Sequence, residues 1–194
     1  MGKLDELLRH RAVWRSRDGL NASHNTSPSG YAALDALLPG GGWPVGALTE
    51  IVVERQGLGE LALVMPTLVA CSRQGRNVAW VAPPYVPYAP ALEQQGLDLS
   101  QVLWLRSNGL AERLWAAEQT LRSGVCGAVM LWLTPHQAPR ISTRNLRRLQ
   151  LAAERGESVA FLFWRRAMTS SVAALRLRVF SKAQGVGASE SVAA

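Results

Sequence analysis

The stretch VVERQGLGEL, residues 52–61, stands where an α/β nucleotide-binding protein carries its phosphate loop. It follows an apolar run, contains Gly57 and Gly59, and leads into the helix-like segment LALVMPTLVACSRQG. A working loop reads G-x-x-x-x-G-K-[ST], because backbone N–H groups cradle the phosphates, the lysine neutralises their charge and the hydroxyl binds magnesium. A glutamate, Glu60, stands where the lysine is needed. The sequence therefore has the position of a phosphate loop without its chemistry.

Other residue types that carry out catalysis are not grouped in the sequence. His10, His24 and His136 are scattered, and none has a metal-ligand neighbour three or four residues away. The serines lack the G-x-S-x-G pattern of a nucleophile elbow. Cys71 and Cys126 sit in apolar segments, so we expect reduced core residues rather than a redox pair.

Strand-like and helix-like apolar segments alternate along the chain, and this alternation indicates an α/β fold. Several are continuously apolar, as in a parallel sheet that is covered on both faces. The predicted strands are 48–53, 78–82, 102–106, 127–133, 158–164 and an edge-like 173–180. The predicted helices are 60–74, 90–95, 109–123 and 142–156. Gly124 and Gly156 are expected to end the last two helices, and Ser142 or Thr143 to cap the last one.

The domain organisation follows from the composition of the two ends. Residues 1–17 resemble an amphipathic helix, residues 18–29 a polar linker, residues 30–182 one folded domain, and residues 183–194 a disordered tail. We find no secretory peptide and no apolar run near the roughly 18 residues that suggest a membrane span. We therefore expect a cytoplasmic protein that does not enter the membrane.

The net charge of +7 is concentrated in the C-terminal third. Residues 30–135 hold six Lys/Arg and eight Asp/Glu, whereas residues 136–182 hold ten and two. Such a basic region fits DNA, an acidic protein partner, or simply a solvated face. The candidate binding residues are Arg144, Arg147, Arg148, Arg155, Arg165 and Arg166.

The seven tryptophans fall into two groups. Those inside apolar segments are expected in the core: Trp80, Trp104 and Trp132. Those at segment edges or among charges are better interface anchors, because tryptophan and arginine dominate binding hot spots: Trp14, Trp43, Trp115 and Trp164. Trp43, which lies between glycines and Pro44, is equally well explained as a structural plug.

Several motifs together resemble a known family. Three segments are similar to the core of RecA: GYAALDALLPGGGWPVGALTEI, VAWVAPPYVPYAPALEQQGLDLSQVLWLR and TLRSGVCGAVMLWL. With LDELLRHRAVWR, GELALVMPTLVACSRQGR, LWAAEQTLRSG and LRRLQLAAERG, the set resembles the ImuA family, in a wider grouping that includes the division inhibitor SulA. The resemblance covers roughly residues 3–180. It implies a RecA-like core with a mainly parallel β-sheet flanked by helices.

The resemblance also implies that the nucleotide chemistry has been lost. Alignment on the RecA loop gives the vestigial positions Glu54, Gly59, Glu60 and Leu61, where the family pattern has glycine, glycine, lysine and a hydroxyl residue. Pro84 stands at the water-activating glutamate and Trp132 at the metal-associated aspartate. Since hydrolysis needs a metal clamp and an oriented water, we expect a protein that is not an enzyme and has no cofactor. Weak nucleotide binding without hydrolysis stays open.

The function that the resemblance implies is indirect. ImuA proteins act in SOS-induced, error-prone translesion synthesis as adaptors with ImuB, which binds the sliding clamp, and with an error-prone C-family polymerase; RecA is a further partner. The alternative is a SulA-like division inhibitor that binds FtsZ. The lead-in GYAALDALLPGGGWP favours ImuA, because SulA proteins lack a comparable segment.

The loop PPYVPYAP carries two tyrosines, Tyr85 and Tyr88. They either mark the edge of the sheet where a ligand docks or, as we prefer, fill the vacated nucleotide site.

Overall fold

The computed structural model describes residues 25–54, 57, 59–165 and 171–180. Several predicted features lie outside this part of the chain: the helix over residues 1–17, most of the linker, the tail, Trp14 and Arg166. Within it, none of the helices is long and apolar enough to cross a membrane.

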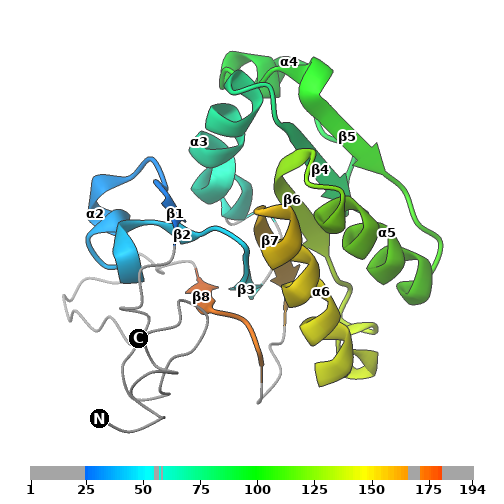
Figure 1. Ribbon diagram of the computed structural model, residues 1–194. Coiled ribbons are helices and arrows are strands. Elements are labelled where there is room, and N and C mark those ends of the chain that lie inside the picture. Colours follow the sequence, from blue (N-terminus) through cyan, green and yellow to red (C-terminus); the bar gives the residue numbers. More distant parts are fainter. Residues whose placement is uncertain (1–24, 55–56, 58, 166–170, 181–194) are drawn as a thin grey trace, which may run out of the picture.

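A six-stranded parallel sheet forms the centre of the fold (Figure 1), which confirms the predicted α/β class. Its strands lie in the order β5-β4-β6-β7-β3-β8, and every neighbouring pair is parallel. Their bounds, in chain order, are β3 (Ala47–Val53), β4 (Asn77–Val81), β5 (Val102–Leu105), β6 (Cys126–Trp132), β7 (Val159–Trp164) and β8 (Leu175–Val179). All six were expected from the sequence, including β8 as an edge strand.

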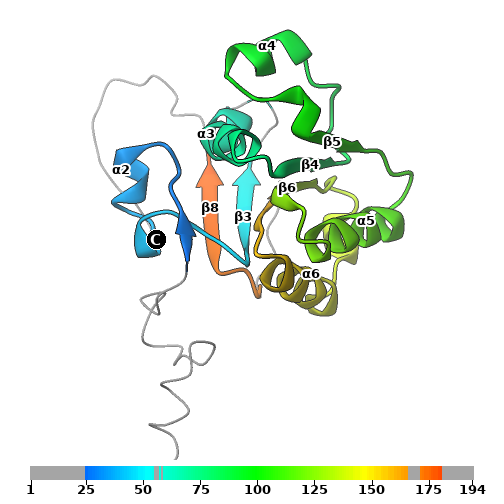
Figure 2. The ribbon, with the colours of Figure 1, turned by 45° about the horizontal axis from the view of Figure 1, so that its top comes forward.

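Helices cover both faces of the sheet (Figure 2). On one face lie α3 (Glu60–Arg73) and the short α4 (Ala89–Gln94), and on the other lie α5 (Leu110–Arg122) and α6 (Thr143–Gly156). Each face buries its own apolar cluster, one around Leu68 and Phe161 and the other around Leu146 and Leu162. Alternate residues of the same strand supply the two clusters, as the two-residue period of a strand requires.

A lead-in at residues 25–46 packs on the α3 side of the sheet (Figure 1). Its strands β1 (Thr26–Ser27) and β2 (Trp43–Pro44) pair antiparallel, and the short helices α2 (Ala32–Asp35) and η2 (Pro39–Gly41) lie between them. Trp43 is fully buried, with its ring edge-on to Phe161 at a centroid distance of 5.2 Å. The hydroxyl of Tyr31 donates to the Ala62 carbonyl of α3 at 2.9 Å. Trp43 is thus a structural plug rather than an interface anchor.

Two boundaries differ from the sequence expectation. Residues 25–29 belong to the folded unit rather than to a linker, since Thr26 and Ser27 form β1 and Ser29 is buried. Gly156 does not end α6 by a left-handed turn; Glu157 does, with φ of 47°. A Cβ atom on Gly156 would lie 1.8 Å from the carbonyl oxygen of Leu121, so the glycine is required by the close approach of α6 to α5.

A buried carboxylate ties the edge strand β8 to the sheet. Glu50 of β3 is fully buried, and its Oε2 accepts a hydrogen bond from Nε of Arg176 on β8 at 2.5 Å. The hydroxyl of Ser171 donates to the other carboxylate oxygen. A buried charge is costly unless it is paired. Detaching β8 would leave the Glu50 carboxylate without its Arg176 partner, so the pairing of β8 with β3 stabilises the fold.

Candidate functional site

The loop at the phosphate-loop position uses its own carboxylate as the anion. Gly57 and Gly59 adopt left-handed backbone angles with φ of 82° and 92°, and Glu60 is the first residue of α3. Oε1 of Glu60 accepts a hydrogen bond from the Gly57 backbone N–H at 3.1 Å. In a working loop such N–H groups and the positive end of the helix bind phosphate. Leu61, the next residue, is half-buried and packs against the core cluster on the α3 side.

An aromatic stack lies at the position to which the RecA resemblance assigns a metal-associated carboxylate. Trp132 ends β6, is buried, and stacks on Phe163 with ring centroids 4.9 Å apart and planes inclined by 11°. On its other side the Trp80 ring centroid lies 5.8 Å away. These rings offer no oxygen ligand for magnesium. Within the described part of the chain, no group of three or more His, Cys, Asp or Glu side chains is placed to hold a metal ion.

The loop that follows β4 does not fill the vacated site, contrary to our preferred expectation. Tyr85 is 70% exposed and Tyr88 is 73% exposed, and Val86 and Pro84 are exposed between and before them. Prolines at positions 83, 84, 87 and 90 leave this segment few backbone rotations. The aromatic side chains therefore project into solvent near the carboxyl ends of the strands.

The four arginines predicted on α6 do share one exposed face. Ser142 caps the helix as expected: its hydroxyl accepts the Asn145 N–H at 3.2 Å, and Oδ1 of Asn145 accepts the Ser142 N–H at 3.0 Å. We call the exposed residues Arg144, Arg147, Arg148 and Arg155 the arginine stripe. Leu151 lies among them at helical spacing and is 63% exposed.

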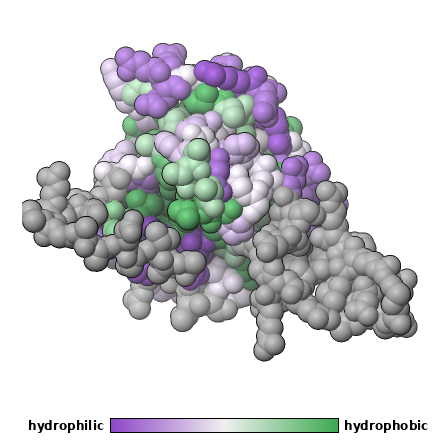
Figure 3. Space-filling model, turned by 90° about the vertical axis from the view of Figure 1, so that its left-hand side faces the viewer, coloured by the Kyte–Doolittle hydropathy of each residue, from purple (hydrophilic) through white to green (hydrophobic). Residues whose placement is uncertain are grey.

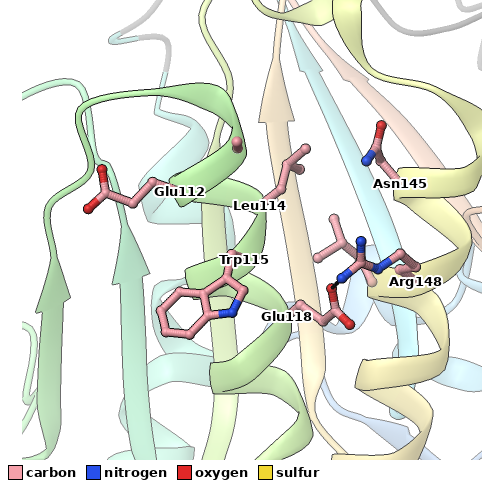
Figure 4. Close-up of a pocket in the computed structure, with 8 residues that line it drawn as sticks. Glu112, Leu114, Trp115, Glu118, Asn145 and Arg148 are labelled. Atoms are coloured by element: carbon pink, nitrogen blue, oxygen red, sulfur yellow. Dashed lines mark ion pairs between the residues drawn. The ribbon is translucent and has the colours of Figure 1, made fainter.

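A groove runs between α5 and α6 beside the arginine stripe (Figure 4). Its volume is about 580 Å³, and its lining includes Leu114, Trp115 and Glu118 from α5 and Arg148 and Leu149 from α6. Nη2 of Arg148 and Oε2 of Glu118 form an ion pair at 2.6 Å that bridges the two helices. Trp115 is 60% exposed. We call this feature the α5–α6 groove.

The remaining sequence candidates are placed elsewhere, and two were wrong. Trp164 ends β7 and is only 1% exposed, so this candidate anchor cannot contact a partner in the folded protein. Trp104, expected in the core, is 39% exposed because β5 is an edge strand, and the Arg106 guanidinium lies 4.7 Å above its ring. Arg165 donates through Nε to the Glu54 carbonyl at 2.9 Å, so this arginine holds the end of β3.

Arg113 is a residue that the sequence analysis missed. From α5 its Nη1 donates to the Trp132 carbonyl at 2.9 Å and to Oε1 of Gln137 at 2.9 Å, and its Nε donates to the Ser107 hydroxyl at 3.1 Å. Burial lowers the pKa of its guanidinium below the usual value. Arg113 thus fixes the loop after β6 beside the α5–α6 groove. No sequence motif marks it, because its partners lie on the loop after β5, at the end of β6 and on the loop after β6, all outside its own helix.

An apolar surface lies on another side of the molecule. Figure 3, viewed from the side of α2 in Figure 1, shows hydrophobic residues gathered at the centre of that face and hydrophilic ones toward its upper rim. Leu37, in the turn after α2, is exposed.

Comparison with known proteins places the chain in a family. The sequence pattern of the family described as "Cell division inhibitor SulA" matches residues 46–160, which is more than half of the chain. The chain belongs to the SulA family. The matched region runs from the residue before β3 into β7, and so contains the predicted phosphate-loop position, Trp132 and the α5–α6 groove, whereas Phe163 lies just beyond it. The lead-in and β8 lie outside it.

Individual relatives give the same grouping. The chain is 27% identical to the cell division inhibitor SulA of Pectobacterium carotovorum over 141 residues, which are 73% of this chain and 82% of that one. It is 25% identical to the protein RecA of Lactobacillus delbrueckii over 138 residues and spans only 41% of that protein's length. The crystal structure of SulA from Pseudomonas aeruginosa is similar with a TM-score of 0.47 and 24% identity, over 59% of this chain and 95% of that one. The sequence comparisons agree with the SulA family match and show a more distant similarity to RecA.

Proposed function

We propose that this chain is a non-hydrolysing SulA-family protein of the bacterial SOS response that acts by binding another protein. The observation that carries the proposal is the Glu60 carboxylate, which accepts the Gly57 N–H at the phosphate-loop position. A triphosphate that approached this loop to about 4 Å would meet a repulsion of roughly 1 to 4 kcal/mol, depending on screening. The stack of Trp132 on Phe163 supports the same conclusion, since it offers no group to bind magnesium or orient a water.

The family match favours one form of this function, a division inhibitor. The matched relatives are named cell division inhibitors, and the match spans most of the sheet and all four of its covering helices. In this form the chain binds FtsZ and prevents its assembly. A protein of this kind needs a stable binding surface rather than a nucleotide cycle, which agrees with the occupied phosphate-loop position.

A second form is favoured by the parts of the fold that the SulA match leaves out. The lead-in is integrated through the buried Trp43, and β8 through the buried pair of Glu50 and Arg176. Together with the RecA similarity, they support an ImuA-type adaptor of error-prone translesion synthesis. Such an adaptor binds ImuB, and through it the sliding clamp and the error-prone polymerase, and also contacts RecA.

Direct binding measurements separate the two forms. The full chain, immobilised for biolayer interferometry, is titrated with purified FtsZ and with purified ImuB, and FtsZ assembly is followed by light scattering. A division inhibitor binds FtsZ and reduces the scattering, whereas an adaptor binds ImuB and leaves FtsZ assembly unchanged. Binding to neither protein would contradict the proposed function. Magnesium-dependent ATP turnover by the purified chain would contradict its non-hydrolysing character.

A further inference from the structure

The arginine stripe and the α5–α6 groove form one continuous surface. Arg148 belongs to both, since it lies on the exposed face of α6 and lines the groove opposite Glu118 (Figure 4). Leu151 lies within the stripe, and Trp115 lies at the groove. Two large apolar side chains are thus exposed beside four arginines.

The charge on this surface is only partly neutralised within the described part of the chain. Arg148 is paired with Glu118, but Arg144, Arg147 and Arg155 form no ion pair there. Glu112 at the groove is engaged in accepting the Asn108 backbone N–H at 2.8 Å. Three guanidinium groups thus remain for a ligand, and arginine binds carboxylates with two parallel hydrogen bonds.

The exposed apolar side chains of this surface favour an acidic protein segment over nucleic acid. Glu112 and Glu118 at the groove repel phosphates and carboxylates alike, so they do not decide between the two ligands. Trp115 and Leu151 gain nothing from phosphates, but they can bury an apolar side chain, and tryptophan and arginine together are typical of binding hot spots. A segment that carries both carboxylates and apolar residues can pair with the three arginines and cover both apolar side chains.

The charge of the chain's own ends argues against an internal occupant. Residues 1–24 contain five Lys/Arg and three Asp/Glu, and residues 181–194 contain one of each. Neither segment offers an excess of carboxylates to three arginines. A second copy would present the same basic stripe and be repelled. The occupant that fits is therefore a different protein.

We infer that the α5–α6 groove and the arginine stripe are the docking site for an acidic, partly apolar segment of the partner protein. The inference rests on the proposed function, because it assigns a surface to the protein binding proposed above. Trp115 supplies the apolar anchor, and Arg144, Arg147 and Arg155 pair with carboxylates of the partner. Arg148 stays with Glu118 and keeps the two helices in place.

The test compares matched variants of the full chain by biolayer interferometry against FtsZ and ImuB. Trp115→Ala and Arg147→Glu should each weaken binding of the true partner about tenfold or more. Two controls carry the same types of change elsewhere: Tyr85→Ala on the loop after β4 and Arg178→Glu on β8, both exposed. These controls should stay within about twofold of the unmodified chain.

Three outcomes would overturn the inference, and they differ from failure of the proposed function. If the partner binds but Trp115→Ala and Arg147→Glu bind it as well as the controls do, the docking site is wrong and the function stands. If Arg147→Glu weakens binding to a duplex DNA probe while Trp115→Ala changes nothing, the surface is a nucleic-acid site.

If neither FtsZ nor ImuB binds, the proposed function fails. The docking site is then tested separately by adding a peptide of alternating Glu-Glu and Leu-Leu pairs to the isotope-labelled full chain. This probe should shift backbone NMR signals of α5 and α6 in the full chain. Signals that shift elsewhere, or not at all, would overturn the docking site.

Discussion

Replacing Glu60 with lysine tests how the loop before α3 is stabilised. In the structure the Glu60 carboxylate accepts the Gly57 N–H and stands at the N-terminus of the 14-residue helix α3. Losing that hydrogen bond costs about 0.5 to 1.5 kcal/mol. Reversing the charge at a helix N-terminus removes a favourable dipole interaction of about 0.3 to 1 kcal/mol and adds an unfavourable one of similar size. Glu60→Lys should therefore lower the free energy of unfolding by about 1 to 3 kcal/mol.

The measurement is urea denaturation followed by circular dichroism. Glu60→Gln keeps an acceptor and loses only the charge, so it should show a smaller loss. Glu93→Lys, an exposed charge reversal on α4, serves as the control and should change stability by less than about 0.5 kcal/mol. If Glu60→Lys is as stable as the unmodified protein, the carboxylate does not hold the loop. If it also gains ATP turnover, the site was one residue away from activity, and our account of the Trp132 stack is wrong.

Four further predictions concern stability and thiol chemistry. Trp43→Ala should cost about 3 to 5 kcal/mol in urea denaturation, since it empties a buried site on Phe161; a cost below about 1 kcal/mol would mean that the lead-in is not part of the core. Arg176→Met should cost about 2 to 4 kcal/mol by leaving the buried Glu50 unpaired, and adding Glu50→Leu should restore most of it; an unstable double variant would contradict this. Burial raises the pKa of the Cys126 thiol to about 11, against the smaller lowering effect of Arg76, so the folded protein at pH 8 should react far more slowly with a disulfide reagent than the unfolded chain. Because that pKa lies above the ordinary thiol value of 9.0, the free energy of unfolding should fall as the pH rises from 9 towards 11.

Much of the fold was predictable because its strands are short apolar runs with polar boundaries. The segments that became β6 and β7 are buried at every position, which is the pattern of central parallel strands. The lead-in was harder, since its polar beginning at Asn25–Ser29 is typical of a linker. Its fold becomes visible only in contacts between distant residues, such as Trp43 with Phe161 and Tyr31 with Ala62. The structural requirement for Gly156 was likewise hidden, because the Leu121 carbonyl that it approaches lies on another helix.

The candidate site was predicted in part. The helical spacing of the arginines was enough to place Arg144, Arg147 and Arg148 on one exposed face. Trp164 was misjudged because arginines follow it directly, although alternate residues of a strand point to opposite faces and its ring enters the core. The groove itself could not be predicted, because α5 and α6 are separated by β6 in the sequence and meet only in the fold.

The most direct test of the central claim is the affinity of the purified full chain for FtsZ and for ImuB, measured with and without magnesium ATP. Our account predicts that one of the two proteins binds, and that its affinity is the same in both conditions within about twofold, because Glu60 occupies the anion position of the loop. Binding that appears only with ATP, or no binding to either protein, would contradict the account.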